Sequence, residues 1–152
     1  MIVYRITLSK FKDDISGQGS ALFGGRWNSK GVYVLYCAEH VSLAVLEMVV
    51  NYDQSSSPIL PSYHLLDIEL PETANHLVTL PPLKKNWERD LPYTQFIGDH
   101  FISEGKFLAM KIPSAVIQEE SNWMINPHHP DFKKIKIKKS KLYQPDSRLF
   151  KV

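Results

Sequence analysis

The sequence has little cysteine and no long hydrophobic run. Its single cysteine, Cys37, excludes an internal disulfide, and a lone cysteine is typical of a reducing compartment. A membrane-spanning helix needs about 20 consecutive apolar residues, and no stretch of this chain approaches that length. We therefore expect a cytoplasmic protein with no membrane association.

Neither sign of charge dominates. The chain has 18 lysines and arginines against 16 aspartates and glutamates, which does not indicate a nucleic-acid-binding protein. Hydrophobic residues make up 43% and charged residues 22%, which excludes a disordered chain, a coiled coil and a collagen-like fibre. A length of 152 residues is enough to close a core, so we expect one domain over residues 1–152.

Residues 133–141 contain six lysines, and the rest of the chain has 12 basic against 16 acidic side chains. We expect a strand with Ile135 and Ile137 facing inward and the lysines facing solvent, which discourages pairing at a sheet edge. A rim that attracts anions is compatible with this arrangement. Direct nucleic-acid binding is not expected, because no aromatic residues alternate with these lysines.

Several standard motifs are missing. Without a Gly-x-Ser-x-Gly elbow, a serine hydrolase is not supported. The absence of Gly-x-Gly-x-x-Gly and of a Walker loop argues against the common dinucleotide and phosphate-loop enzymes. His128, His129 and Asp131 lie in one turn, but their spacing matches no standard metal site, so no metal is expected.

The alternation of apolar residues predicts strands over residues 3–8, 32–37, 62–70, 107–112, 122–125 and 133–139, and helices over residues 40–51 and 94–104. Loops or irregular segments are expected over residues 9–25, 53–58 and 71–92. Strands and helices that do not alternate strictly predict an α+β fold, a mixed sheet with flanking helices. The first helix is apolar nearly all round and is expected to be buried. The second should be amphipathic, with one face formed by Phe96, Ile97, His100 and Phe101.

Glu47 breaks the pattern of the first predicted helix. Its neighbours three and four positions away are Leu43, Leu46 and Val50, so its carboxylate should meet apolar surroundings. An unpaired buried carboxylate is costly. Periodicity alone does not decide between a structural ion pair with an arginine and a functional acid.

Arg26 follows two glycines in the stretch Gly-Gly-Arg-Trp-Asn at residues 24–28. Glycines allow close approach of the backbone to a ligand, and a guanidinium suits bidentate contact with phosphate or carboxylate. Arg26 could instead pair with Glu47 or bind a carbonyl. Trp27 is expected in the core.

Tyr36 and Ser114 are two further candidates. A tyrosine on the predicted strand at residues 32–37 is usually a core residue with a bonded hydroxyl, although Tyr36 could also form an aromatic pocket wall. Ser114 follows Pro113 directly after a strand and, taken alone, is only a turn serine.

Six stretches, in order over nearly the whole chain, resemble the RES domain family, which is named for an Arg, a Glu and a Ser. They are residues 24–28, 31–36, 43–47, 112–116, 122–127 with 129–132, and 146–149. The resemblance implies a bacterial toxin that is encoded beside an Xre-like antitoxin with a helix-turn-helix domain. It also implies a fold similar to ADP-ribosyltransferases and an enzyme that consumes NAD+.

The resemblance assigns roles to individual residues. The family's Arg, Tyr and Glu match Arg26, Tyr36 and Glu47, and its Ser matches Ser114; Arg5 matches an arginine of less certain meaning. Cleavage of NAD+ at the nicotinamide–ribose bond passes through a state resembling an oxocarbenium ion, which a carboxylate at Glu47 could stabilise.

The predicted NAD+ contacts follow from these roles. Arg26 would hold a phosphate or ribose oxygen, Tyr36 would stack on nicotinamide, and Ser114 would bind the ligand or orient Arg26 or Glu47. Trp27 and Asn28 are expected beside the same ligand.

Two other functions stay open at this point. The chain could transfer ADP-ribose to a specific protein rather than to water, or it could be a non-catalytic domain that binds a partner. A homodimer within a toxin–antitoxin assembly is also compatible with the resemblance. The sequence identifies neither the acceptor nor the antitoxin-binding surface.

Overall fold

The computed structural model describes residues 1–53, 55, 59–73 and 76–150. Its strands are β1 (Ile2–Leu8), β2 (Leu35–Ala38), β3 (Tyr63–Glu69), β4 (Leu77–Thr79), β5 (Ala109–Pro113), β6 (Ser121–Ile125) and β7 (Lys136–Tyr143). Its α-helices are α1 (Gln18–Phe23), α2 (Val41–Val50) and α3 (Leu91–Glu104). Short 3-10 helices span Ser9–Phe11, Trp87–Arg89, Pro130–Lys134 and Ser147–Phe150.

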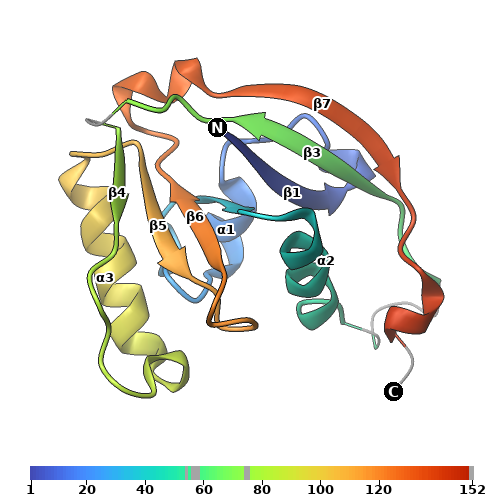
Figure 1. The fold of residues 1–152 in the computed structure, drawn as a ribbon, viewed down its shortest axis with the longest axis horizontal. Helices are drawn as coiled ribbons and strands as arrows, with labels where there is room; N and C mark the ends of the chain where they lie inside the picture. Colours follow the sequence, from blue (N-terminus) through green and yellow to red (C-terminus); the bar gives the residue numbers. More distant parts are fainter. Residues whose placement is uncertain (54, 56–58, 74–75, 151–152) are drawn as a thin grey trace.

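The strands form one sheet in the order β4-β5-β6-β2-β1-β3-β7. β4 and β5 are parallel, and the other neighbouring pairs are antiparallel. Strands β1, β3 and β7 arch over α2, while α3 lies beside β4 and β5 (Figure 1). The expected α+β class, with a mixed sheet and flanking helices, is confirmed.

The two faces of the sheet have different partners because successive strand residues point to opposite sides. Leu35 and Cys37 of β2 belong to one buried cluster, with Val3, Leu66 and Ile125. The residue between them, Tyr36, faces the other side. It packs there against a cluster formed by Trp27, Val34, Trp87, Phe101, Met110, Ile112 and Met124.

Two predicted irregular segments contain regular structure. Residues 9–25 include α1, which is bracketed by Gly17 at φ 76° and Gly24 at φ 71°. One glycine precedes the helix and the other follows it, so the segment is not a continuous loop. Residues 71–92 include β4 and the start of α3, where the side chain of Asp90 accepts a hydrogen bond from the Tyr93 N–H. Most of the loop predicted over residues 53–58 lies outside the described residues.

The predicted faces of both long helices need correction. In α3 the buried residues are Thr94, Gly98 and Phe101, whereas Phe96 is 73% exposed and its ring stacks on that of the exposed His100. The segment around Trp27 packs directly on Gly98, which turns that stripe inward.

Helix α2 is buried only along one stripe. The stripe is formed by Leu43 and Ala44, and Val50 is 63% exposed, because the helix meets the sheet with one face. Among the described residues, no helix combines the length and the apolar character that crossing a bilayer requires.

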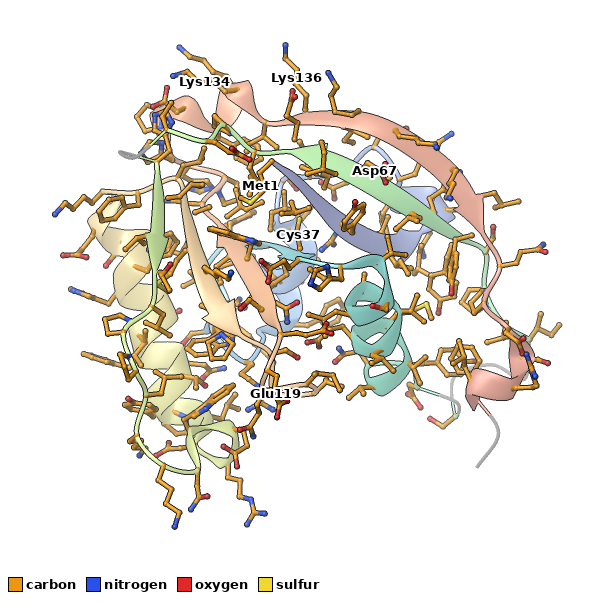
Figure 2. The ribbon with its side chains drawn as sticks, viewed as in Figure 1. Met1, Cys37, Asp67, Glu119, Lys134 and Lys136 are labelled. Carbon is orange, nitrogen blue, oxygen red and sulfur yellow. The ribbon has the colours of Figure 1, made fainter. Side chains whose placement is uncertain are left out.

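β7 is an edge strand of the sheet, as expected, but it begins later than predicted. Lys133 and Lys134 end the preceding 3-10 helix instead of starting the strand. Ile135 is buried, Ile137 is half-buried and the lysines of the strand are exposed, which confirms their predicted orientation. Figure 2 shows Lys134 and Lys136 pointing outward, at the opposite end of the molecule from Glu119.

Candidate active site

Glu47 lies one helical turn after Leu43, on the stripe of α2 that faces the sheet. Leu43 is fully buried against Ala38 of β2, and Glu47 follows where this apolar contact ends. The half-buried carboxylate accepts two hydrogen bonds at the same oxygen, Oε1: one from Ser114 Oγ at 2.8 Å and one from Asn122 Nδ2 at 2.6 Å. No described residue donates to Oε2.

Ser114 is fully buried, and its hydroxyl is oriented by the turn that follows β5. Its oxygen accepts hydrogen bonds from the backbone N–H groups of Val116, at 3.0 Å, and Ile117, at 3.1 Å. A serine hydroxyl has two acceptor lone pairs and one proton. Since both lone pairs are used, the proton is directed to Glu47.

Asn122 is the residue of this cluster that the sequence did not single out. It lies on β6, between β5 and β2, and is paired with Ile112 on one side and Ala38 on the other. Two sequence signals mark its position: it is a polar residue directly before the apolar run Trp123, Met124 and Ile125, and it begins one of the six stretches that carry the family resemblance.

Tyr36 lies on the same face of the sheet as Asn122. It pairs with Met124, two residues along β6, and residues two apart on a strand share a face. Its hydroxyl donates to Asn28 Oδ1 at 2.7 Å. Burial raises the pKa of Tyr36 well above its usual value, so this hydroxyl keeps its proton.

The side chains of Asn28 and Trp27 are buried on this same face, in contacts with other protein groups. Asn28 is fully buried, and its amide nitrogen donates to the carbonyls of Ser20, Ser29 and Val32. Trp27 is 3% exposed, as expected for a core residue, and its ring lies 5.5 Å from that of Trp87. Direct contact of either side chain with a ligand stays a prediction.

Arg26 directly precedes Trp27 in the Gly-Gly-Arg-Trp-Asn segment at residues 24–28. Its half-buried guanidinium donates through Nη1 to the carbonyl of Glu88 at 2.6 Å. Within the described part of the chain, this is the only hydrogen bond of the Arg26 side chain, and no ion pair joins it to Glu47. Ser114 and Asn122 thus supply the donors that the ion-pair alternative assigned to an arginine.

The side chain of Arg5 contacts the backbone of β2. Its Nη1 donates to the Tyr36 carbonyl at 3.0 Å, while its buried Nε has no hydrogen-bond partner among the described residues. Close by, burial raises the pKa of the Cys37 thiol to about 12. Arg5 therefore holds β2 to β1 at the position of Tyr36.

A cavity of about 370 Å³ lies beside the Glu47 cluster rather than at it. It is lined in part by Pro113 and Ser121, the chain neighbours of Ser114 and Asn122, and by Lys111 and Trp87. The predicted turn at residues 128–131 is engaged elsewhere, since Asp131 binds His76 at 2.6 Å and Lys134 at 2.9 Å. No group of three or more potential metal ligands occurs among the described residues.

The fold of the chain also occurs in a protein of known structure. It is similar to a chain in the crystal structure of the M. tuberculosis MbcT–MbcA toxin–antitoxin complex, with a TM-score of 0.75 over 93% of this chain and 83% of that chain. The two are 19% identical, so this likeness shows the fold alone. The RES domain model matches residues 2–148, and the chain therefore belongs to the RES domain family.

Curated relatives match over nearly their whole length. "Toxin Res" of Photorhabdus laumondii is 36% identical, covering 99% of this chain and 98% of the relative. "Toxin Res" of Pseudomonas putida is 33% identical, covering 99% and 100%. "Prs ADP-ribosylating toxin" of a Sphingobium species is 33% identical, covering 91% and 88%.

Proposed function

We propose that this RES domain protein is the toxin of a toxin–antitoxin pair and that it consumes NAD+ by cleaving the nicotinamide–ribose bond. The observation that supports this most is the Glu47 carboxylate, which is fixed through Oε1 by Ser114 and Asn122 and whose Oε2 receives no hydrogen bond from a described residue. Its position on the same sheet face as Tyr36, and the names of the full-length relatives, point the same way.

The chemistry needs little proton transfer. The C–N bond breaks with its electron pair moving to the nicotinamide nitrogen, so nicotinamide leaves as a neutral molecule. The ribose that remains resembles an oxocarbenium ion, and a fixed negative charge beside it lowers the barrier. A water molecule then adds its oxygen to the ribose carbon and releases one proton, giving ADP-ribose.

Four of the candidate residues have a defined role in this proposal. Glu47 accepts a hydrogen bond from a ribose hydroxyl through Oε2 and supplies the negative charge. Tyr36 provides its ring as a stacking surface for nicotinamide, since its hydroxyl is engaged with Asn28. Arg26 uses its remaining N–H groups to hold a phosphate or ribose oxygen, and Ser114 orients Glu47.

The test is release of nicotinamide from NAD+ by the purified chain, measured by chromatography. Glu47→Gln should lower turnover by about 10²-fold or more, the scale of losing one electrostatic stabiliser. Glu119→Gln is the matched control, because it makes the same chemical change at an exposed position in the loop between β5 and β6. Equal turnover by the wild type and folded Glu47→Gln would refute the assignment.

Transfer of ADP-ribose to a protein is the second candidate, favoured by the relative named as an ADP-ribosylating toxin. It uses the same NAD+ site and differs in the acceptor. The wild type would be incubated with a cell extract and NAD+ labelled in the adenylate part. A labelled protein band that disappears with Glu47→Gln indicates transfer, whereas labelled free ADP-ribose alone indicates hydrolysis.

An antitoxin partner is part of the proposal, supported by the toxin–antitoxin complex of similar fold. We expect an Xre-like protein with a helix-turn-helix domain, encoded next to this chain. Co-expression of that neighbour should restore growth of cells that express this chain and should preserve their NAD+ level. Unchanged toxicity during co-expression would contradict this partner.

A further inference from the structure

Glu47 is held by a second donor besides the expected serine. Asn122 reaches Oε1 at 2.6 Å, a shorter distance than the 2.8 Å from Ser114. Only the amide nitrogen of Asn122 can face this oxygen favourably, because its amide oxygen and an ionised carboxylate are both acceptors. A hydrogen bond to a charged group is among the stronger kinds in a protein.

The two donors reach Glu47 from different elements. Ser114 sits in the turn that leaves β5, whereas Asn122 is anchored in the middle of the sheet by pairing with both β5 and β2. Two donors at one oxygen restrict rotation of the carboxylate plane. Oε2 then has one preferred direction, away from Ser114 and Asn122.

We infer that Asn122 is a positioning residue, whose amide, together with Ser114, fixes the Glu47 carboxylate so that Oε2 is presented to the ligand. The inference rests on the proposed NAD+ reaction for its kinetic consequence. The contact between Asn122 and Glu47 can be tested without that reaction.

The kinetic test compares two substitutions at this position. Asn122→Leu removes the donor at similar size, and we expect kcat to fall about tenfold or more with KM for NAD+ within about threefold, since orientation is lost and most of the binding surface is kept. Asn122→Asp keeps the shape but places a second carboxylate against Oε1. At neutral pH we expect it to lose at least as much activity as Asn122→Leu.

The pH profile separates positioning from packing. In Asn122→Asp, two carboxyl groups at one site tend to share a proton as the pH falls, and this proton restores a donor between them. Turnover of this variant, relative to wild type, should therefore rise as the pH is lowered from neutral. A purely packing role predicts the reverse order, with the isosteric Asn122→Asp close to wild type at neutral pH. Near-wild-type activity of Asn122→Asp at neutral pH would overturn the inference, as would full kcat in folded Asn122→Leu.

A spectroscopic measurement covers the case in which the wild type does not turn over NAD+, a result that would refute the proposed function alone. In ¹⁵N NMR spectra, the Asn122 side-chain amide protons should shift strongly on Glu47→Gln and less on Ser114→Ala. The control Glu119→Gln should leave them unmoved. If Glu47→Gln also left them unmoved, the contact would not exist in solution and the positioning role would fall.

Discussion

The hydroxyl of Tyr36 donates to Oδ1 of Asn28 at 2.7 Å, and this bond joins β2 to the Gly-Gly-Arg-Trp-Asn segment. Asn28 uses its amide nitrogen on three backbone carbonyls of the same region. The position of the Tyr36 ring is therefore set by a buried amide that is itself fixed by the backbone. A change at either residue should be felt by the other.

Tyr36→Phe should separate the ring from its hydroxyl. The variant leaves Asn28 Oδ1 buried without this donor, which should lower the free energy of unfolding by about 1–3 kcal/mol. If the ring acts by stacking, kcat should change much less than in Tyr36→Ala, which removes the surface. Thermal unfolding and nicotinamide release measure the two effects. Equal loss of kcat in both variants would assign a direct role to the hydroxyl.

Gly25→Ala should disturb the same hydrogen bond from the other side. A Cβ at this position would lie 2.6 Å from Asn28 Oδ1 and 3.3 Å from the Tyr36 hydroxyl. We expect destabilisation of about 1–3 kcal/mol, and a smaller cost when the change is made in Tyr36→Phe, because the bond is already lost. Gly19→Ala is the matched control, since an added Cβ there meets no atom of the described residues within 4 Å. Additive losses in the double variant would show that Gly25 acts independently of Tyr36.

Apolar periodicity predicted most of the sheet and both long helices, because these elements bury one stripe or one face. It missed α1, since the glycines at its ends have the composition of a loop, and it missed β4, since three residues among prolines give no usable period. The prediction of the wrong buried face for α3 has a similar origin. Gly98 contributes no hydrophobicity, yet its lack of a side chain is what brings α3 onto Trp27.

The site was only partly accessible from the sequence. Glu47 was visible because it interrupts an apolar helix, and Ser114 became visible through the family pattern. Asn122 begins one of the matching stretches but received no role, because its importance depends on the register between β6 and β2, which places it opposite Ala38. The ion-pair alternative for Glu47 was equally reasonable by pattern. Only the three-dimensional arrangement shows neutral donors at the carboxylate and Arg26 at a backbone carbonyl.

Cys37 should report on folding in all these variants. It is 3% exposed, and burial raises the pKa of its thiol to about 12, so almost no thiolate forms at neutral pH. A thiol reagent should therefore modify the native protein very slowly and the unfolded protein at once. Labelling followed by mass spectrometry measures this. Rapid labelling of the native wild type would contradict the buried position of β2.

Because of Asp90, the stability of α3 should decrease at acidic pH. Its pKa is lowered by hydrogen bonds from the Lys84 side chain and from the Tyr93 N–H. A group with a lowered folded-state pKa stabilises the fold above its ordinary value, near 4, and loses this contribution as the pH falls through the lower value. Asp90→Asn keeps a capping oxygen and removes the charge. Denaturant unfolding between pH 6 and pH 2 should show a shallower loss for this variant, and identical slopes would exclude the contribution.

Gly98→Ala should destabilise the protein although the same change usually stabilises a helix. In a helix interior, glycine costs about 1 kcal/mol relative to alanine. Here an added Cβ would lie 1.7 Å from the Trp27 carbonyl oxygen and 2.7 Å from the Trp27 carbonyl carbon. The backbone at Trp27 must therefore move away from α3. We expect a net loss of about 2 kcal/mol or more in the free energy of unfolding. Turnover of NAD+ should fall as well, because Arg26 and Asn28 shift with Trp27.

Ser103→Ala, at an exposed position of the same helix, should stay within about 0.5 kcal/mol of wild type. A Gly98→Ala variant as stable as wild type would show that α3 does not pack on Trp27 this closely.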